Sequence, residues 1–316
     1  MRAIQYHKHG GSEVLQLETL DQPSPGPGEV LISVRATSVN GIDVRRRSGR
    51  LPESELPKIP GVDAAGVIEA VGDAVTTFNV GDRVFGVSYG HGGTYAEYIT
   101  LPVENIDHLP ASVSFIDGAA TAHVGMTAWR AILDHGDLGL ADTCLIHGAA
   151  GGVGHLAVRL AEESGATVVA TAGAEETIQR VSEFGADHVL DFRRDDLAEA
   201  ITEVAGGVDV ILDPHLSHYL ELDVEVAAHD GRIVSIAGNA PSFENVPTAR
   251  IKDVTIQPMA VFNAPSYTDI LGGLSHLLEF ERLIPEITTT YDLAMADDAQ
   301  QEYDQIRLGK ILLSFD

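Results

Sequence analysis

The chain has 316 residues, of which 44% are hydrophobic, and its 20 basic and 47 acidic side chains give a formal net charge of −27. This length suits two domains of ordinary size, and the apolar content is sufficient for packed cores rather than disorder. The charge argues against general affinity for nucleic acid, which requires a basic surface, and the apolar runs are too short to cross a bilayer.

Residues up to about 109 are typical of β-structure with turns between the strands. The runs 30–36, 64–72 and 82–86 are typical of strands, whereas 23–28 and 89–93 are rich in proline or glycine and predict loops. The pattern therefore predicts a partly closed β-domain.

From about residue 114 the pattern changes to short apolar strands that alternate with helices. The predicted elements are strands at 143–147, 167–171, 189–191, 208–212 and 232–236, helices at 153–164, 175–184 and 267–281, and a strand-like tail at 310–314. Alternation at this spacing predicts an α/β domain, with a parallel sheet and helices on both faces.

The segment 147–154, HGAAGGVG, lies between a predicted strand and a predicted helix. In the dinucleotide fingerprint, glycine permits a tight turn, a close approach of the backbone to a pyrophosphate, and close packing of helix on strand. The N-terminus of the helix adds unpaired N–H groups and a positive dipole end. The predicted cofactor-binding residues of this turn are Ala149, Ala150, Gly151, Gly152, Val153 and Gly154, of which Ala149, Gly151 and Gly154 stand at the three glycine positions.

The residues after the second strand of this domain bear on the identity of the dinucleotide. Proteins that bind NAD usually carry Asp or Glu about 20 residues after the glycine turn, but this strand runs into Gly173 without an acid. The gap favours NADP, with Gly173 beside the cofactor and with Arg193 and Arg194 as countercharges for the 2′-phosphate. Against this, Glu175 and Glu176 would repel a phosphate, and the two arginines are equally typical of a solvated surface. NAD therefore stays open.

Acidic residues occur along the whole chain, whereas only four lysines are present: Lys8, Lys58, Lys252 and Lys310. Salt would screen the resulting self-repulsion, since the Debye length falls to about 3 Å near 1 M. One hypothesis is a cytoplasm rich in potassium salt, as in halophilic archaea, and the alternative is an ordinary acidic protein. The single cysteine, Cys144, excludes an intramolecular disulfide, and no secretion signal opens the chain, so we expect a cytoplasmic protein.

A series of motifs across almost the whole length identifies a family resemblance. These are PGVDAAGV at 60–67, GDRVFG at 81–86, GTYAEY at 93–98, GMTAW at 125–129, the turn at 149–154, GAD at 185–187, GRIV at 231–234 and GKI at 309–311. The chain resembles the zinc-independent, zeta-crystallin-like quinone oxidoreductases and enone reductases of the medium-chain dehydrogenase/reductase superfamily. The resemblance implies a GroES-like β-barrel catalytic domain at 1–118, a Rossmann domain at 119–264, a return of 265–316 to the catalytic domain, an active site in the cleft and a homodimer.

The resemblance also implies that no catalytic metal is used. Where zinc-dependent relatives carry a cysteine ligand this chain has Asn40, and where they carry a His-Glu pair it has Val62 and Asp63. His215 and His218 are spaced as a helical pair, but a turn or helix cap explains them more simply than a metal.

Several site residues follow from the resemblance by position. Asn40 is expected beside the nicotinamide, and Thr127 is expected to contact the nicotinamide half of the cofactor. Asp43 either acts in the site or forms a structural hydrogen bond. Arg45 lies near a position where many relatives carry tyrosine. It either steadies an enolate or an anionic acceptor, or belongs to an arginine face paired with the acidic surface. Tyr89 is expected to line the acceptor pocket, together with His91 and His123.

Without a metal, hydride transfer to an acceptor that is already electrophilic remains available. The acceptor would be a quinone or an α,β-unsaturated carbonyl, and its developing oxyanion needs a hydrogen-bond donor. The leading hypothesis is an NADPH-dependent quinone or enone reductase. The alternatives are an enoyl-thioester reductase, for which a tyrosine acid is not evident, and a nicotinamide-nucleotide-binding protein with little turnover.

Overall fold

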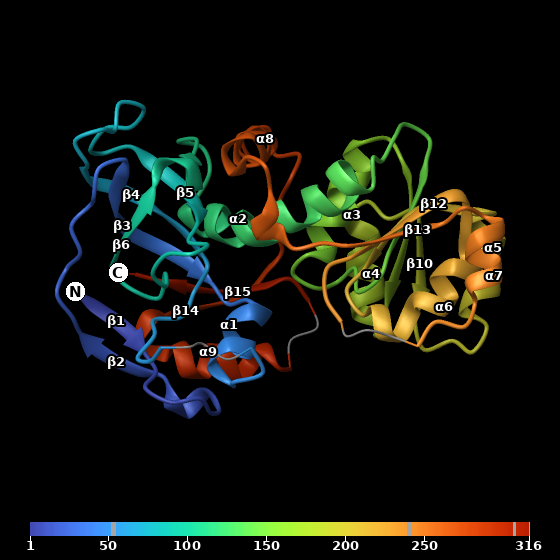
Figure 1. Cartoon of the computed structure of the whole chain (residues 1–316), viewed down its shortest axis with the longest axis horizontal. Helices are drawn as coiled ribbons and strands as arrows, with labels where there is room; N and C mark the ends of the chain where they lie inside the picture. The colour runs from blue at the N-terminus through green and yellow to red at the C-terminus, as the bar shows by residue number, and fades with distance from the viewer. Residues whose placement is uncertain (52–54, 239–241, 306–307, 316) are drawn as a thin grey trace. The chain divides into compact units, whose positions relative to one another are not determined.

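A computed structural model describes residues 1–51, 55–238, 242–305 and 308–315. The chain divides into two compact units. In Figure 1 the first unit has the colours of the two ends of the chain and the second has the colours of its middle. The first unit consists of Met1–His123 and Pro265–Asp316, and the second is Val124–Ala264. Helix α2 (Phe115–Trp129) begins in the first unit and ends in the second.

The first unit is built mainly from β-strands. Its strands are β1 (Arg2–Gln5), β2 (Gln16–Thr19), β3 (Glu29–Ser38), β4 (Asp63–Val71), β5 (Arg83–Val87), β6 (Tyr98–Pro102), β7 (Ile106–His108), β14 (Ile287–Asp292) and β15 (Lys310–Ser314). Its other helices are α1 (Gly41–Arg47), α8 (Tyr267–Glu279) and α9 (Ala296–Tyr303), with short 3-10 turns at Ser12–Val14, Val103–Asn105 and Leu293–Met295.

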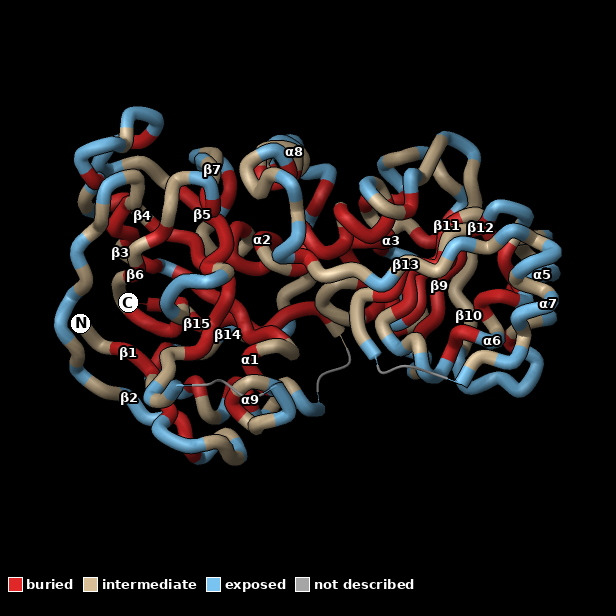
Figure 2. The backbone as a smooth tube through the Cα atoms, viewed as in Figure 1, coloured by how far each residue is buried: buried red, intermediate tan, exposed pale blue. Residues whose placement is uncertain are grey.

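The main sheet of this unit is arranged around β3. Within the described residues it runs β14-β15-β3-β4-β5-β7, and β6 also pairs with β3. Alternate residues of β3 (Val30, Ile32 and Val34) enter one buried apolar cluster, as the two-residue period of a strand requires. Figure 2 shows these central strands as buried backbone. Because β3 is antiparallel to both β4 and β15, its end at Ser38 lies beside the starts of those two strands.

The second unit alternates strands and helices. Its strands are β8 (Thr143–Ile146), β9 (Thr167–Ala172), β10 (His188–Asp191), β11 (Val208–Asp213), β12 (Ala227–Ser235) and β13 (Thr255–Pro258). Its helices are α3 (Gly154–Glu163), α4 (Glu175–Glu183), α5 (Leu197–Ala205), α6 (Leu216–Val226) and α7 (Val246–Ile251), with a π-helical segment at Arg130–His135 and a 3-10 turn at Val261–Asn263.

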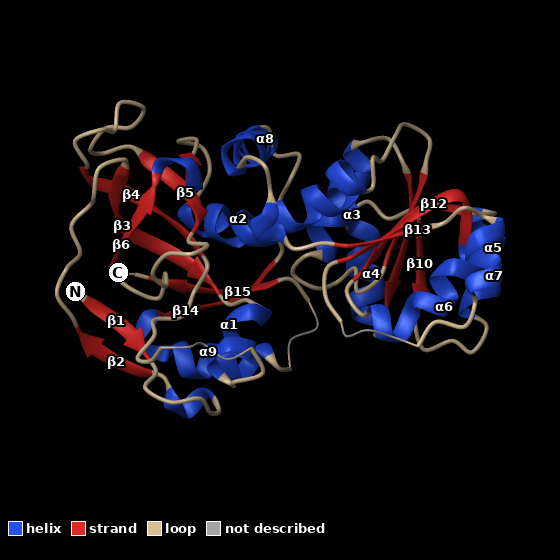
Figure 3. Cartoon of the chain, in the orientation of Figure 1, coloured by secondary structure: helices blue, strands red, loops and turns tan. Residues whose placement is uncertain are grey.

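The strands of the second unit form one parallel sheet. Among the described residues the order is β10-β9-β8-β11-β12-β13, with every neighbouring pair parallel. Figure 3 shows helices against both faces of this sheet, which confirms the predicted doubly wound α/β domain. The order reverses at β8, which lies between β9 and β11, and ligands of such folds bind beyond the carboxyl ends of the strands at this point.

The predicted elements lie close to the observed ones, with one clear difference. Strand β12 begins at Ala227, ahead of the predicted 232, and its pairing with β11 shifts register between Val208 and Val210. Asp230 in this stretch has a positive φ of 61°, an irregularity that hid the start of the strand. Across the described residues, none of the helices combines the length and the apolar character needed to span a membrane.

Candidate active site

The glycine-rich turn joins β8 to α3 with little space around its backbone. Gly148 has a φ of +63°, and a Cβ on Gly154 would lie 2.3 Å from the Gly148 carbonyl oxygen, so glycine is required at both positions. At Gly151 an added Cβ would meet only the Gly148 carbonyl oxygen, at 3.4 Å. The Ala149 N–H donates to the Thr171 carbonyl at 3.1 Å and so ties the turn to β9. The turn leaves its outer side open at Gly151, where a pyrophosphate fits.

The helix after the turn suits an anion. Its N-cap residue is Val153, whose side chain cannot accept a hydrogen bond from the first amides of α3. Backbone N–H groups at such a helix start, together with the positive end of the dipole, attract phosphate. The residues from Ala149 to Gly154 therefore fit a dinucleotide phosphate in the place that the sequence predicted.

In the first unit, a buried polar cluster forms where β3, β4 and β15 meet. The Asp63 carboxylate accepts hydrogen bonds from the Ser38 backbone N–H at 2.6 Å, the Ser38 hydroxyl at 2.7 Å and the Asn40 Nδ2 at 2.7 Å. The Lys310 ammonium donates to the Val39 carbonyl at 2.9 Å and to the Asn40 Oδ1 at 2.6 Å. Asn40 thus bridges a buried cation and a buried anion, and this pairing fixes the orientation of its amide.

A second carboxyl, Asp43, completes this cluster. It accepts from the Asn40 backbone N–H at 2.9 Å and from the Gly61 backbone N–H at 3.2 Å. Burial, and then the charge of Asp63, raise the pKa of Asp43 to about 7. Burial also raises the pKa of Asp63 and lowers the pKa of Lys310. The opposite charges of Asp63 and Lys310 counteract this effect of burial, so each group helps to keep the other charged. Asn40 and Asp43, predicted as site residues, lie together in this cluster.

Tyr89 and His123 form a second polar pair in the first unit. The Tyr89 hydroxyl lies 2.6 Å from His123 Nδ1, and the Tyr89 ring contacts the Tyr267 ring edge-on at 5.5 Å between centroids. Desolvation, followed by the cations of Lys310, Arg46 and Arg45, lowers the pKa of His123 to about 3. The imidazole is therefore neutral at pH 7 and lies in a positive electrostatic potential.

Comparison with known proteins places these sites in a family. Residues 26–111 match the alcohol dehydrogenase GroES-like domain, and residues 152–275 match the zinc-binding dehydrogenase domain. The chain is 34% identical to the quinone oxidoreductase of Sus scrofa over 321 residues, which cover 99% of this chain and 97% of that protein. The chain belongs to the quinone oxidoreductase family of the medium-chain dehydrogenases/reductases.

Solved structures agree with this membership. The Escherichia coli quinone oxidoreductase, determined in complex with NADPH, superposes with a TM-score of 0.90 at 27% identity, covering 100% of both chains. An NAD-dependent alcohol dehydrogenase superposes with a TM-score of 0.91 at 29% identity, again over 100% of both chains. The predicted pairing of a GroES-like domain with a Rossmann domain is thereby confirmed.

One of the matched domains is named for zinc, an ion that proteins hold with Cys, His, Asp or Glu side chains. The described residues of this quinone oxidoreductase family member do not provide such a set. In the part of the chain that the structure describes, no group of three or more His, Cys, Asp or Glu side chains could hold a metal ion. Asp63 is instead engaged by Ser38 and Asn40, beside the Lys310 ammonium. These residues do not fit zinc.

The residues predicted to select NADP lie in the second unit, after β9 and β10. Arg193 forms a two-pronged pair with Asp191, and Arg194 pairs with Asp196 at 2.9 Å, all on the surface. A Cβ on Gly173 would lie 2.3 Å from the Phe192 ring, so the ring covers this glycine. To bind the 2′-phosphate of NADP, both arginines would have to leave these carboxylates. Their role in selecting NADP stays a prediction.

The remaining predicted residues occupy three settings. Thr127 is buried on α2 in the part that belongs to the second unit. Arg45 is exposed on α1 and donates to the Gly41 carbonyl at 3.4 Å. His215 is the N-cap residue of α6, as expected for a helix cap, and His218 lies in the first turn of that helix.

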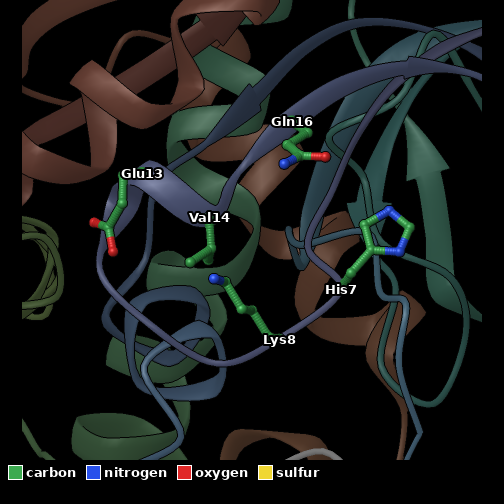
Figure 4. Close-up of a pocket in the computed structure, with 5 residues that line it drawn as sticks. All are labelled: His7, Lys8, Glu13, Val14 and Gln16. Atoms are coloured by element: carbon green, nitrogen blue, oxygen red, sulfur yellow. The ribbon is translucent and has the colours of Figure 1, made fainter.

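Two surface hollows are found among the described residues. A hollow of about 230 Å³ in the first unit is lined by His7, Lys8, Glu13, Val14 and Gln16, as Figure 4 shows. A hollow of about 440 Å³ in the second unit is lined partly by Phe192, Arg194 and Tyr219. Only Arg194 of the predicted site residues lines either of these two hollows.

Sequence reasoning missed the polar residues that support the site. Lys310 belongs to the GKI motif and is one of four lysines, and its place just before the apolar residues Ile311–Leu313 is the signal that could have marked it as a buried partner. In the sequence, His147 is simply the first residue of the HGAAGGVG segment, and no motif contains Asp223. Asp223 lies between apolar residues on one helix, and the sequence does not reveal that it faces His147.

Proposed function

We propose that this protein is an NADPH-dependent quinone oxidoreductase that uses no metal. The observation that carries the proposal is the turn from His147 to Gly154, whose close packing and open outer side fit a dinucleotide pyrophosphate. The full-length similarity to quinone oxidoreductases supports the same activity. Alcohol oxidation through a metal alkoxide lacks its ligands among the described residues.

The chain's own residues divide the work between binding and charge stabilisation. The backbone from Ala149 to Gly154 binds the pyrophosphate through N–H groups at the start of α3. When bound, the reduced nicotinamide supplies a hydride. The quinone that accepts it develops negative charge on oxygen, and the protein must stabilise this charge and deliver a proton.

We propose that Tyr89 and His123 meet that oxygen. The 2.6 Å contact orients the phenol, and the neutral imidazole can donate from Nδ1 to the Tyr89 oxygen, which leaves the phenol proton for the acceptor. Lys310, Arg46 and Arg45 depress the pKa of His123 after desolvation, and the same positive potential stabilises an oxyanion. The Asn40 amide is held between Lys310 and Asp63, so in this proposal Asn40 has a structural role and does not transfer a proton.

The acceptor is tested by following NADPH oxidation with a small quinone and, separately, with a simple enone. Rapid oxidation with the quinone is expected, and oxidation with the enone alone would identify an enone reductase instead. NADPH that binds but is oxidised by neither acceptor would refute the proposed activity and leave the binding-protein alternative.

Tyr89→Phe tests the proton donor. Loss of the hydroxyl should lower kcat with the quinone about a hundredfold to ten-thousandfold, the range for a positioned proton donor, with a smaller effect on KM. Tyr98→Phe on β6 is the matched control, and it should retain wild-type kcat. Equal kcat in both variants would remove Tyr89 from the mechanism.

We further propose that the protein acts on a small-molecule quinone in the cytoplasm as a homodimer, without nucleic-acid or membrane partners. The formal charge of −27 argues against phosphate backbones as partners. Light scattering coupled to size-exclusion chromatography in molar potassium chloride should give twice the mass of 33.6 kDa, and a monomer would refute the dimer.

A further inference from the structure

A group of buried titratable side chains lies directly beneath the glycine-rich turn. His147 follows β8 and precedes Gly148, Asp213 is the last residue of β11, and Asp223 lies on α6. His147 is 1% exposed, and both aspartates are 0% exposed. The parallel strands place His147 and Asp213 at the same edge of the sheet, where the turn begins.

His147 connects the turn to its neighbours. Its Nδ1 lies 3.1 Å from the Thr171 hydroxyl on β9, and its Nε2 lies 2.9 Å from the Asp223 Oδ1. Its ring stacks on the Tyr219 ring at 4.1 Å between centroids and 2° between planes. The network is satisfied when Nε2–H donates to Asp223 and Nδ1 accepts from Thr171, which is the neutral imidazole.

The two aspartates each retain one buried oxygen without a partner. The Asp213 Oδ1 accepts from the His215 backbone N–H, but the Oδ2 atoms of Asp213 and Asp223 have no hydrogen-bond donor. The two carboxyls are within hydrogen-bonding reach of each other. Two adjacent buried carboxylates repel, whereas one proton between the two Oδ2 atoms satisfies both. Burial, and then the neighbouring Asp223, raise the pKa of Asp213 to about 7.

No lysine or arginine among the described residues provides a positive charge that could take the place of this proton. Among the described residues, no lysine or arginine forms an ion pair with either aspartate. The groups next to the pair are His147 from the end of β8, and His215 and Tyr219 from the start of α6. Around these groups, Thr171 of β9 contacts His147, Ser235 of β12 is the strand partner of Asp213, and His218 contacts the Tyr219 ring. Burial, followed by the neighbouring His218 and His147, lowers the pKa of His215, which makes it a poor source of positive charge.

We propose that Asp213 and Asp223 share a proton that, through the Asp223–His147 hydrogen bond, holds the glycine-rich turn in its binding geometry, so that loss of this proton weakens dinucleotide binding. The three are positioning residues, since the His147 side chain, directly before Gly148, is held between Thr171 of β9 and Asp223 of α6. Deprotonation sets two negative carboxylates against each other, pulls on the Asp223–His147 contact and adds negative charge at the strand edge that faces the phosphates. The inference rests on the proposed binding of a dinucleotide at this turn.

The predicted signature is a pH-dependent affinity with a break near neutral pH. If binding requires one proton, Kd rises about tenfold per pH unit above the break and is constant below it. The 2′-phosphate of NADPH titrates by itself, so NADH provides the comparison without that group. The same break is expected with both cofactors.

The experiment measures Kd for NADPH and NADH by fluorescence titration of the full chain from about pH 6 to about pH 9. Asp223→Asn replaces the shared proton by an amide that can still accept from His147 and donate to Asp213. This variant should bind at high pH as tightly as the wild type binds at low pH, with no break. Asp213→Asn, made as a second variant, should behave in the same way.

Asp209→Asn is the matched control, because Asp209 lies at the other end of β11 and accepts from the Thr143 N–H at 2.8 Å. It should keep the wild-type break. A wild-type Kd without a break, a break seen only with NADPH, or a uniform loss of affinity in Asp223→Asn and Asp213→Asn with the break retained would overturn the shared proton. Absence of binding of both cofactors at every pH would overturn the proposed function as well.

Discussion

Each of the two units buries a polar cluster, and the buried carboxyls of the two clusters have different partners. In the first unit, Asp63 is matched by the Lys310 ammonium, with the Asn40 amide between them. In the second unit, Asp213 and Asp223 have a histidine but no lysine or arginine among the described residues that pair with them. One cluster is held by an internal cation and the other by a proton.

This difference separates what each cluster can do. The Lys310 ammonium is held by hydrogen bonds to Val39 and Asn40, so it supports the first cluster and contributes a positive potential at His123. The part of this cluster that responds to pH is Asp43, whose pKa is about 7. A shared proton exchanges with solvent, so the second cluster responds to pH near neutrality. The same protein therefore combines a buried lysine near His123 with a buried pair of carboxyls, without a lysine or arginine partner among the described residues, beneath the turn.

Lys310→Met should break the first cluster and give the largest effect. The substitution leaves Asp63 and Asp43 buried without their cation, which costs about 3–5 kcal/mol in the free energy of unfolding. Urea unfolding followed by circular dichroism measures this loss. Lys8→Met, on the surface, is the control and should change the midpoint little; equal midpoints in both variants would show that the ammonium is dispensable.

Gly154→Ala and Gly151→Ala should separate folding from binding at the turn. The added Cβ at 154 meets the Gly148 carbonyl oxygen at 2.3 Å, whereas at 151 it meets the same atom at 3.4 Å. Gly154→Ala should lower stability by about 1–3 kcal/mol, as overpacking does. Gly151→Ala should keep its melting temperature and raise the Kd for NADPH about tenfold. Unchanged binding in Gly151→Ala would mean that no phosphate approaches this face.

Stability against pH should sharpen the comparison further. Asp43 and Asp213 have folded-state pKa values of about 7, above the value of about 4 for an unfolded chain. Their contribution is full below about pH 4 and is lost as the pH rises to about 7, because only the folded state then binds the protons. Replacement of either residue by asparagine should reduce that loss by up to about 4 kcal/mol, which is three pKa units at about 1.4 kcal/mol each, read from urea midpoints at several pH values. An identical pH profile in wild type and variants would show that these carboxyls are ionised throughout.

The smallest effect is expected at the surface arginines. Arg193→Ala and Arg194→Ala should each lower the preference for NADPH over NADH about threefold, because an exposed charge pair is weak. Competition between the two cofactors measures the ratio, with Arg250→Ala as the exposed control. A ratio equal to that of the control would make both arginines ordinary surface residues.

The fold was largely predictable because its signals are local. Alternating strands and helices and the turn at 147–154 predicted the parallel sheet, and the motif series identified the family. The roles predicted for Asn40 and for Ala149–Gly154 by the same route stay predictions. The supporting clusters were not predictable, because they depend on contacts far apart in sequence: Lys310 reaches Asn40 across 270 residues, and His147 reaches Asp223 across 76. A single sequence shows the polar residue but does not show its partner.

The measurement that tests the central claim most directly is the kcat/KM for NADPH and for NADH with one small quinone, in molar potassium chloride. We predict quinone-dependent oxidation of both, with the larger kcat/KM for NADPH. A larger value for NADH would contradict the assignment of NADP. Absence of quinone-dependent oxidation with either cofactor, in protein that binds both, would contradict the proposed oxidoreductase itself.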